Sequence, residues 1–461
     1  MSYYDLLEAL ARPGCPICYL AKRTTYRYLD FLSYENVNDP GLRARLRTAH
    51  GFCNYHAWQF VDDMDDGLGT AIIYRDIVTA LEAMLTLAGA GSLDLLAGLR
   101  SGPRRHTNGL AKRLAPRGEC PACYQLDVLT RVYVDTLLDH VDDPDLYAAL
   151  ARSTGLCLPH LGQALARAST WEQAQPLART VGEAYTRLSA DRLAAATVLP
   201  LLAGAPGAAF DLSPVLAASP GREPNVAVPE GGGCPVCRGA LAASDARLHG
   251  LASAGDESVG ALCNSHAARY LALGLDGGDI WTRLLADWAG RLLAPASPAA
   301  ASRRYATVLA ALGRLAAPGP GAALARGLAP HAACPACLAR TSAEQALSAQ
   351  AGRGEHGALC LSHFLLSLLN GTDAPALRAL VAVQSQANRD IIASLSKFIR
   401  KRDYRFTHEP PGEEADSPER AVALVAGARG LGGMGELPGA QSEGLERRQV
   451  HARGRQRGAG D

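Results

Sequence analysis

Cys15-Pro-Ile-Cys18, followed by Cys53-Asn-Tyr-His56, is the stretch of sequence that decides how this chain folds. The same two motifs, CPxC and then CxxH, occur three more times. The later copies are Cys120-Pro-Ala-Cys123 with Cys157-Leu-Pro-His160, Cys234-Pro-Val-Cys237 with Cys263-Asn-Ser-His266, and Cys334-Pro-Ala-Cys337 with Cys360-Leu-Ser-His363. These motifs use all 12 cysteines, and their first cysteines lie 105, 114 and 100 residues apart. The sequence therefore predicts four repeats of about a hundred residues.

The first two repeats resemble each other beyond these motifs. Asp39-Pro40 matches Asp143-Pro144, and the glycine two residues before Cys53 matches the one before Cys157. In the third and fourth repeats the insert between the two motifs shortens from 34 and 33 residues to 25 and 22, and its aromatic residues give way to small ones. An ancestral duplication followed by a second, reduced pair is the simplest interpretation.

The chain is expected to be helical throughout. Ala, Leu, Arg and Glu dominate, and apolar residues recur every three or four positions, as in Ile391-Leu395-Phe398. Each Asp-Pro pair predicts a helix start, because Asp caps a free amide and Pro lacks only a hydrogen that would stay unpaired. We predict an all-α fold of four degenerate helical repeats, each organised around a Cys₃His zinc site and arranged as two halves. Each repeat should end in a long helix, such as 71–88 or 176–198.

Stretches rich in glycine and proline suggest the boundaries between these units. The predicted segments are repeat 1 (1–100), repeat 2 (101–202), a linker (203–233), reduced repeat 3 (234–315), reduced repeat 4 (316–406) and a mostly disordered tail (407–461) with a short helix near 417–428. A cut within the 203–233 linker should leave two halves that each fold alone.

The motifs suit a metal ion. Zinc takes four sulfur or nitrogen ligands in a tetrahedron, and a CxxC turn presents two thiolates to one ion. A cysteine and a histidine three residues apart at a helix start point the same way, and the helix dipole favours the thiolate. We therefore predict four zinc ions. Pairing the two motifs of one repeat is the simplest assignment, but exchange of ligands between neighbouring repeats stays open. The expected ligands are Cys15, Cys18, Cys53, His56, Cys120, Cys123, Cys157, His160, Cys234, Cys237, Cys263, His266, Cys334, Cys337, Cys360 and His363.

Other chemistries compete with a structural zinc site. Three cysteines and a histidine can hold an iron–sulfur cluster, and CPxC resembles the redox motif of glutaredoxins, although that motif belongs to a βαβ fold. A catalytic zinc keeps a position open for water, whereas these sites have four protein ligands. No catalytic residues are assigned. The leading hypothesis is a scaffolding or protein-binding module, and the alternative is a redox, metal-handling or iron–sulfur protein.

Charge and hydropathy limit the partners. Lys plus Arg (46) and Asp plus Glu (45) nearly cancel, so no overall field favours nucleic acid. The N-terminus lacks a secretory signal pattern, and no apolar run reaches the length of a membrane helix. We expect a cytoplasmic protein with reduced cysteines and another protein as its partner.

Some further side chains invite a functional interpretation. His50 and His356 each precede a glycine near a ligand pair, and a role confined to that turn is favoured over metal ligation. The aromatic residues after the first CxxC are expected to belong to the core, because such a stripe on an amphipathic helix is usually buried. They are Tyr26, Tyr28, Phe31 and Tyr34.

The CPIC motif, the GFCNYH element and the segment 398–406 (FIRKRDYRF) together resemble an uncharacterised bacterial family, a domain of unknown function with CPxC, GFCxxH and a C-terminal (K/R)xDYR element. This resemblance implies metal binding and a bacterial origin, and it implies no reaction. Within the last element, either the side chains contact a partner or Tyr404 and Phe406 fasten the chain to the helices while Asp403 pairs with an arginine. The structural role is favoured. The residues concerned are Arg402, Asp403, Tyr404 and Arg405.

Overall fold

A computed structural model of the chain describes residues 2–90, 110–190, 193–204, 233–294, 334–351, 357–370, 374–406 and 408–431. Within these ranges the regular elements are all helices, so the predicted all-α fold class is confirmed. None of these helices combines the length and the apolar character that a membrane span requires. Most of the predicted linkers, His356 and the chain beyond residue 431 lie outside the described residues.

The helices follow the same order after each CPxC motif. The first group is α1 (Ser2–Leu10), α2 (Pro16–Phe31), a π-helical turn (Leu32–Asn36), α3 (Pro40–Ala49), α4 (Asn54–Met64) and α5 (Gly67–Ala90). The second group is α8 (Pro121–Asp139), α9 (Pro144–Arg152), α10 (Leu158–Arg167), α11 (Trp171–Ser189) and α12 (Ala195–Ala203).

The second half of the chain gives two shorter groups. The third group is α13 (Pro235–Ala254), a 3₁₀ turn (Glu257–Ala261), α14 (Asn264–Ala272) and α15 (Ile280–Leu293). The fourth is α19 (Pro335–Ala351), α20 (Leu361–Leu369), α21 (Ala374–Lys401) and α22 (Ser417–Ala426). In every group a CxxH motif opens the helix that precedes a longer one.

The predicted helix starts are confirmed. The side chain of Asp39 accepts a hydrogen bond from the backbone amide of Leu42, and that of Asp143 accepts one from Leu146. One predicted helix is wrong, because 176–198 is divided between α11, which ends at residue 189, and α12, which begins at residue 195. The short helix expected near 417–428 is α22.

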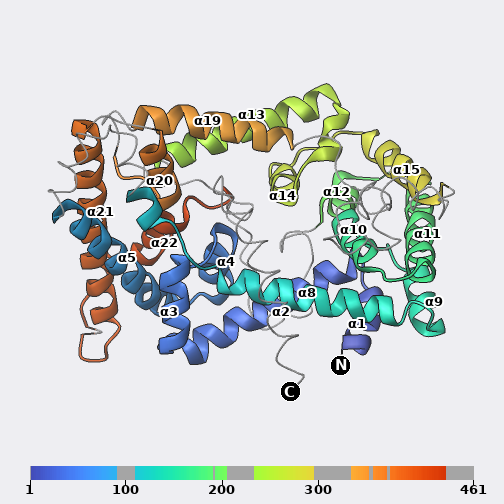
Figure 1. Cartoon of the computed structure of the whole chain (residues 1–461), viewed down its shortest axis with the longest axis horizontal. Coiled ribbons are helices and arrows are strands. Elements are labelled where there is room, and N and C mark those ends of the chain that lie inside the picture. Colours follow the sequence, from blue (N-terminus) through green and yellow to red (C-terminus); the bar gives the residue numbers. More distant parts are fainter. Residues whose placement is uncertain are drawn as a thin grey trace, which may run out of the picture.

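The helices form a rectangular frame (Figure 1). Along one long edge α2 and α8 lie side by side and run in opposite directions, and α13 and α19 do the same along the opposite edge. Two groups of helices close the short edges. We call them lobe A, at the right in Figure 1 (α1, α9, α10, α11, α12, α14 and α15), and lobe B, at the left (α3, α4, α5, α20, α21 and α22).

Each lobe has a hydrophobic core that draws on both halves of the sequence. In lobe A, α11 packs against α15, and buried Tyr185 and Trp281 belong to one cluster. In lobe B, α5 packs against α21, and buried Tyr74 and Phe364 belong to the other. The final helix of each half also crosses over: α12 packs on α14 and α15, and α22 packs on α4 and α5. The expectation that the halves fold alone therefore conflicts with cores that both halves build.

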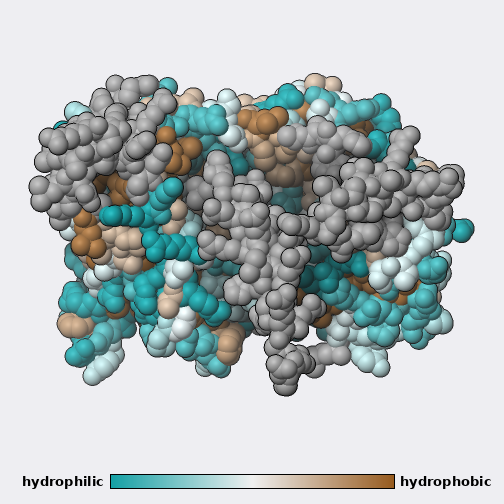
Figure 2. All heavy atoms as spheres, in the orientation of Figure 1, coloured by the Kyte–Doolittle hydropathy of each residue, from teal (hydrophilic) through white to brown (hydrophobic). Residues whose placement is uncertain are grey.

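Among the residues that Figure 2 colours by hydropathy, hydrophilic ones predominate on the lower part of the face shown, with apolar areas scattered among them. The aromatic stripe of α2 is only partly core. Phe31 is 53% exposed and Tyr34 is 90% exposed, whereas Leu29 and Leu32 are buried. The expectation that these aromatic side chains belong to the core is wrong for Phe31 and Tyr34.

Candidate metal centres

The eight motifs meet as four groups of three cysteines and one histidine, and in each group the potential ligand atoms all lie within 4.8 Å of one another. We number them by their CPxC motifs. Site I is Cys15, Cys18, Cys157 and His160; site II is Cys53, His56, Cys120 and Cys123; site III is Cys234, Cys237, Cys360 and His363; site IV is Cys263, His266, Cys334 and Cys337.

The two motifs of one repeat do not meet. The CPxC motif of the first repeat joins the CxxH motif of the second, and the reverse pairing completes the other site of that half. The third and fourth repeats exchange their motifs in the same way. Pairing within a repeat, the simplest assignment from sequence, is therefore wrong, and the exchange between neighbours that the sequence left open is what the fold contains.

Every ligand pair stands at the start of a helix. The first cysteine of each pair directly precedes its helix, as Cys15 precedes α2 and Cys157 precedes α10. The second ligand comes three residues later, inside the first turn. The first amides of a helix lack partners within the helix and carry its positive end. Each site thus gathers two helix starts around its sulfurs, which favours thiolate and so favours metal binding.

The spacing of the ligand atoms matches one metal ion. In all four sites the Sγ to Nδ1 distances are 3.2–3.7 Å, and the closest Sγ to Sγ distances are 3.5–3.7 Å. Zinc bonds of about 2.3 Å to sulfur and about 2.0 Å to nitrogen give tetrahedral edges of about 3.8 and 3.5 Å. A cluster would divide its ligands among several iron atoms and hold some of them farther apart.

The thiols of each site are electrostatically unequal. Burial raises the pKa of the Cys15 thiol, but hydrogen bonds from Cys157 and Cys18 bring that pKa well below its usual range. The first cysteine of every other CPxC motif shows the same direction, with hydrogen bonds from neighbouring cysteines as the lowering cause (Cys120, Cys234 and Cys334). At each site, neighbouring thiols thus lower the pKa of the first cysteine of the CPxC motif.

The raised pKa values of three of the site histidines indicate the same negative potential. Burial by itself would lower the pKa of His160, yet the neighbouring Cys18 and Cys15 raise it to about 10. In sites III and IV the balance is similar, and the pKa rises to about 11 for His363 and to about 9 for His266. A site that raises the pKa of a buried histidine attracts a cation, whether that cation is a proton or a metal ion.

The four sites differ in how they are covered. In sites I and III the final helix of a half ends in a glycine laid against the sulfurs. A Cβ on Gly204, after α12, would lie 3.7 Å from the Sγ of Cys157, and one on Gly427, after α22, would lie 3.6 Å from the Sγ of both Cys237 and Cys360. Both glycines have positive φ, 76° and 86°, which suits a residue without a side chain. We call sites I and III the covered sites.

Sites II and IV are the open sites. All the cysteines of the covered sites are buried, whereas each open site has two partly exposed cysteines. They occupy the same positions in both sites, namely the cysteine of the CxxH motif and the second cysteine of the CPxC motif. In site II they are Cys53 and Cys123, and in site IV they are Cys263 and Cys337.

Side chains outside the motifs hold the ligands in place. The hydroxyl of Tyr185 donates to the carbonyl of Leu156, next to a ligand of site I, and the amide oxygen of Gln384 accepts from the backbone of Leu359, next to a ligand of site III. Glu344 lies 3.5 Å from the Nε2 of His363. A carboxylate on the second nitrogen of a metal-binding histidine fixes the ring and makes it a stronger ligand.

Sequence reasoning missed these supporting residues. The glycine covers carry a faint signal, because Leu202-Ala203-Gly204 and Val425-Ala426-Gly427 end two apolar helices in the same way. For Tyr185, Gln384 and Glu344 the sequence offers no such signal, because each meets its partner only through the packing of helices.

His50 lies near site II without joining it. It ends α3 in a left-handed conformation with φ 54°, so its predicted turn-local role is confirmed. The ring is 7% exposed and its Nδ1 has no hydrogen-bond partner. Burial, together with the nearby charge of Arg117, lowers its pKa to about 4. His50 is therefore neutral at physiological pH.

The C-terminal element after α21 is held by charges. Asp403 pairs with Arg405, as predicted, at 2.6 Å. Tyr404 is 85% exposed, and its fastening role stays a prediction. The Phe406 ring lies under the guanidinium of Arg400, 4.7 Å from its centre. Arg402 lies over the Phe398 ring in the same way, at 4.8 Å. None of the four residues singled out from the sequence belongs to a metal centre in the described part of the chain. They are Arg402, Asp403, Tyr404 and Arg405.

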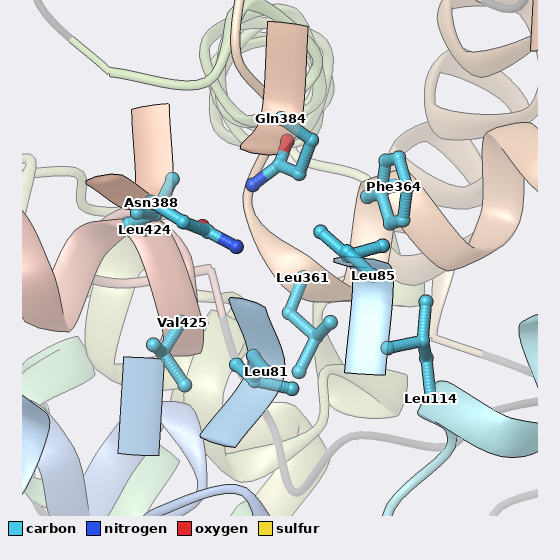
Figure 3. A pocket seen from close by; sticks show the side chains of 9 residues that line it. All are labelled: Leu81, Leu85, Leu114, Leu361, Phe364, Gln384, Asn388, Leu424 and Val425. Atoms are coloured by element: carbon cyan, nitrogen blue, oxygen red, sulfur yellow. The ribbon is translucent and has the colours of Figure 1, made fainter. Parts of the chain in front are cut away.

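Lobe B also contains a small apolar pocket between α5, α20, α21 and α22 (Figure 3). Leu361, Phe364 and Val425 line it, and the amides of Gln384 and Asn388 point into it. Its enclosed volume of about 10 Å³ is that of a single water molecule. Gln384 and Asn388 already bond to Leu359 and Glu82, so the pocket belongs to the core.

Residues 5–191 match the model of a family of unknown function, DUF6062. This stretch contains every ligand of sites I and II. The match covers 187 of the 461 residues, so it shows that this stretch is similar to that family. The match includes the CPIC motif and the GFCNYH element on which the resemblance was based, while the second half and the 398–406 element lie outside it. The family description names no activity for either site.

One curated relative is described as an uncharacterized 23.9 kDa protein in the xynA 3' region of Caldicellulosiruptor sp. (strain Rt8B.4). It is 34% identical over 77 residues, which are 17% of this chain and 37% of that protein. The match thus covers little more than a third of the relative's length. No solved structure matches the chain.

Proposed function

We propose that each of sites I–IV binds one zinc ion and that the protein is a zinc-stabilised helical scaffold that binds another protein in the cytosol. The observation that carries this proposal is the exchange of motifs. Each closed group of four ligands joins helix starts from two repeats, so an ion in it would cross-link segments that lie far apart in the sequence. A closed site leaves no position for a substrate, which favours a structural role.

Zinc is the metal that best fits these ligands. Three thiolates and an imidazole at tetrahedral distances suit zinc, and binding at such sites contributes directly to folding, by about 10 kcal/mol or more in small zinc peptides. The proposed cytosolic location is supported by the twelve cysteines, because thiols that serve as metal ligands stay reduced there. A single iron would fit the same geometry, so metal content decides between them.

The test is elemental analysis and an absorption spectrum of freshly purified protein. We expect four zinc ions per chain and no visible absorbance. A coloured protein that contains iron, with or without labile sulfide, would overturn the assignment.

Paired substitutions test the exchange of motifs separately. Cys15→Ser with Cys157→Ser removes two ligands of one site, so the double variant should lose one zinc ion. Cys15→Ser with Cys53→Ser removes one ligand from each of two sites and should lose two. Pairing within repeats would give the opposite order, two ions and then one.

A further inference from the structure

The two open sites are partly exposed at the same two ligand positions. Site II comes from the first half of the chain and site IV from the second, yet the same two ligand positions are partly exposed in both. Their third cysteines, Cys120 and Cys334, are each only 9% exposed. Among the described glycines, none has a sulfur of site II or site IV among its nearest neighbours, whereas Gly204 and Gly427 lie against sulfurs of sites I and III. The described part of the chain thus gives each half one covered and one open site.

The sulfurs of the two partly exposed cysteines in each open site are also neighbours. The Sγ atoms of Cys53 and Cys123 are 3.5 Å apart, and those of Cys263 and Cys337 are 3.6 Å apart. A disulfide needs these atoms at about 2.0 Å, so a movement of about 1.5 Å joins them. An oxidant reaches a thiolate according to its exposure, so these pairs should react before the buried thiolates of sites I and III.

We propose that sites II and IV are redox-labile zinc sites, at which hydrogen peroxide joins Cys53 to Cys123 and Cys263 to Cys337 and releases the metal, while sites I and III keep theirs. This inference rests on the zinc occupancy proposed above. At each open site two zinc-bound thiolates give up two electrons and form one S–S bond. One peroxide molecule takes those electrons and two protons to become two water molecules. The ion then leaves as Zn²⁺, because only two of its protein ligands remain.

Release at an open site would act on the fold, not only on the metal. Site II ties the start of α4 to the start of α8, and site IV ties the start of α14 to the start of α19. Each therefore fastens a lobe to one of the long edges. The covered sites would still hold the other end of each edge, so oxidation should loosen the frame at two opposite corners without unfolding it.

The experiment adds hydrogen peroxide to the zinc-loaded full-length protein and follows released zinc with a colorimetric chelator. We expect two of the four ions to be released in a fast phase, with the other two retained until the protein is denatured. Peptide mapping of the product should find Cys53 linked to Cys123 and Cys263 linked to Cys337. Release of all four ions at one rate, release of none, or disulfides within the CPxC motifs would overturn the proposal.

Matched variants assign the fast phase to particular sites. Cys53→Ser should leave three zinc ions, of which only one is released quickly, whereas Cys18→Ser should leave three, of which two are. Alkylation of the unmodified, zinc-loaded protein supplies an independent measurement if a variant fails to fold. The cysteines labelled first should be the four partly exposed ones, Cys53, Cys123, Cys263 and Cys337. A purified protein without zinc would contradict the proposed function, while four stably bound ions that peroxide does not distinguish would contradict this inference alone.

Discussion

Lobes A and B contain the same parts but hold them with different side chains. Each has one covered site and one open site, drawn from opposite halves of the chain. In lobe A, Thr154 precedes the glycine before a CxxH motif, and its hydroxyl accepts from the amide of Gly14 and donates to its carbonyl. In lobe B the equivalent residue is His50, which has no such bonds. The metal geometry is thus set by motifs and helix starts, while the supporting polar groups vary.

The covers differ as well. In lobe B, Gly427 and the residues after it are tied to α4, because Asn54 donates to the carbonyls of Ala426 and Ala428 and the indole of Trp58 donates to that of Gly427. The amide of Ala428 also lies 3.5 Å from the Sγ of Cys237. Lobe B, in which the Nδ1 of His50 has no partner, is therefore the lobe whose described cover is held by these hydrogen bonds.

The largest effect should come from separating the halves. Residues 1–215 and 216–461, expressed separately, should each be insoluble or molten, because α11 loses α15 and α5 loses α21. Co-expressed, they should form a one-to-one complex with native near-ultraviolet circular dichroism. A protease site placed in the same stretch of the intact chain is the control, and cleavage there should leave the complex together. If each half folds independently, the cores that both halves build are not required for folding, and this prediction is contradicted.

Acid should weaken lobe B through His50. The neutral form is favoured in the fold, where the pKa is about 4, and the unfolded chain takes up a proton below its usual pKa of about 6.5. The stability due to this group is therefore complete above pH 6.5 and is lost as the pH falls towards 4. His50→Asn, which tolerates the left-handed conformation, should escape that loss.

The measurement is the free energy of unfolding of wild type minus that of the variant, at equal zinc content, between pH 7 and pH 4. This difference should fall by on the order of 3 kcal/mol. Thr154→Ser in lobe A introduces no titrating group, so its difference from wild type should stay flat across the same range. A flat line for His50→Asn would mean that the ring finds a proton acceptor in the fold.

Shortening the chain should convert a covered site into an open one. A protein ending at Ala426 loses Gly427 and the bonds of Trp58 and Ala428, which should lower its stability by about 1–3 kcal/mol. Peroxide should then release three zinc ions quickly instead of two, as site III joins the open sites. A protein ending at Leu431 keeps every described contact and is the control. An unchanged count of two would show that the cover does not protect the sulfurs.

The smallest expected effect is the change in zinc affinity at site III when Glu344, the carboxylate beside His363, loses its charge. Glu344→Gln keeps the size of the side chain but removes the charge near the Nε2 of His363, so zinc affinity at site III should fall by about tenfold. A chelator competition that resolves the sites should show this change at site III and none at site I. Equal affinities in the variant and wild type would mean that Glu344 serves only its pair with Arg340.

The sequence by itself determined the ligands and the helix starts. A CPxC or CxxH motif fixes its own geometry, because the cysteine precedes the helix and the second ligand lies one turn inside it, whatever surrounds them. Asp39 and Asp143 likewise cap their helices through bonds to amides only a few residues away. The all-α class follows from the same local preferences, which act within a few residues and need no tertiary partner.

Only the tertiary structure decided which motifs meet and which sites are covered. Helix α2 has 16 residues and is about 24 Å long, so it carries the chain away from Cys18 before the next motif begins at Cys53. Helix α8 runs back beside it, which brings the CxxH of each repeat to the CPxC of its neighbour. Exposure depends on Gly204 and Gly427, which reach their sulfurs only after whole helices have packed. Pairing and cover are long-range properties, and four-residue motifs of the same pattern cannot encode them.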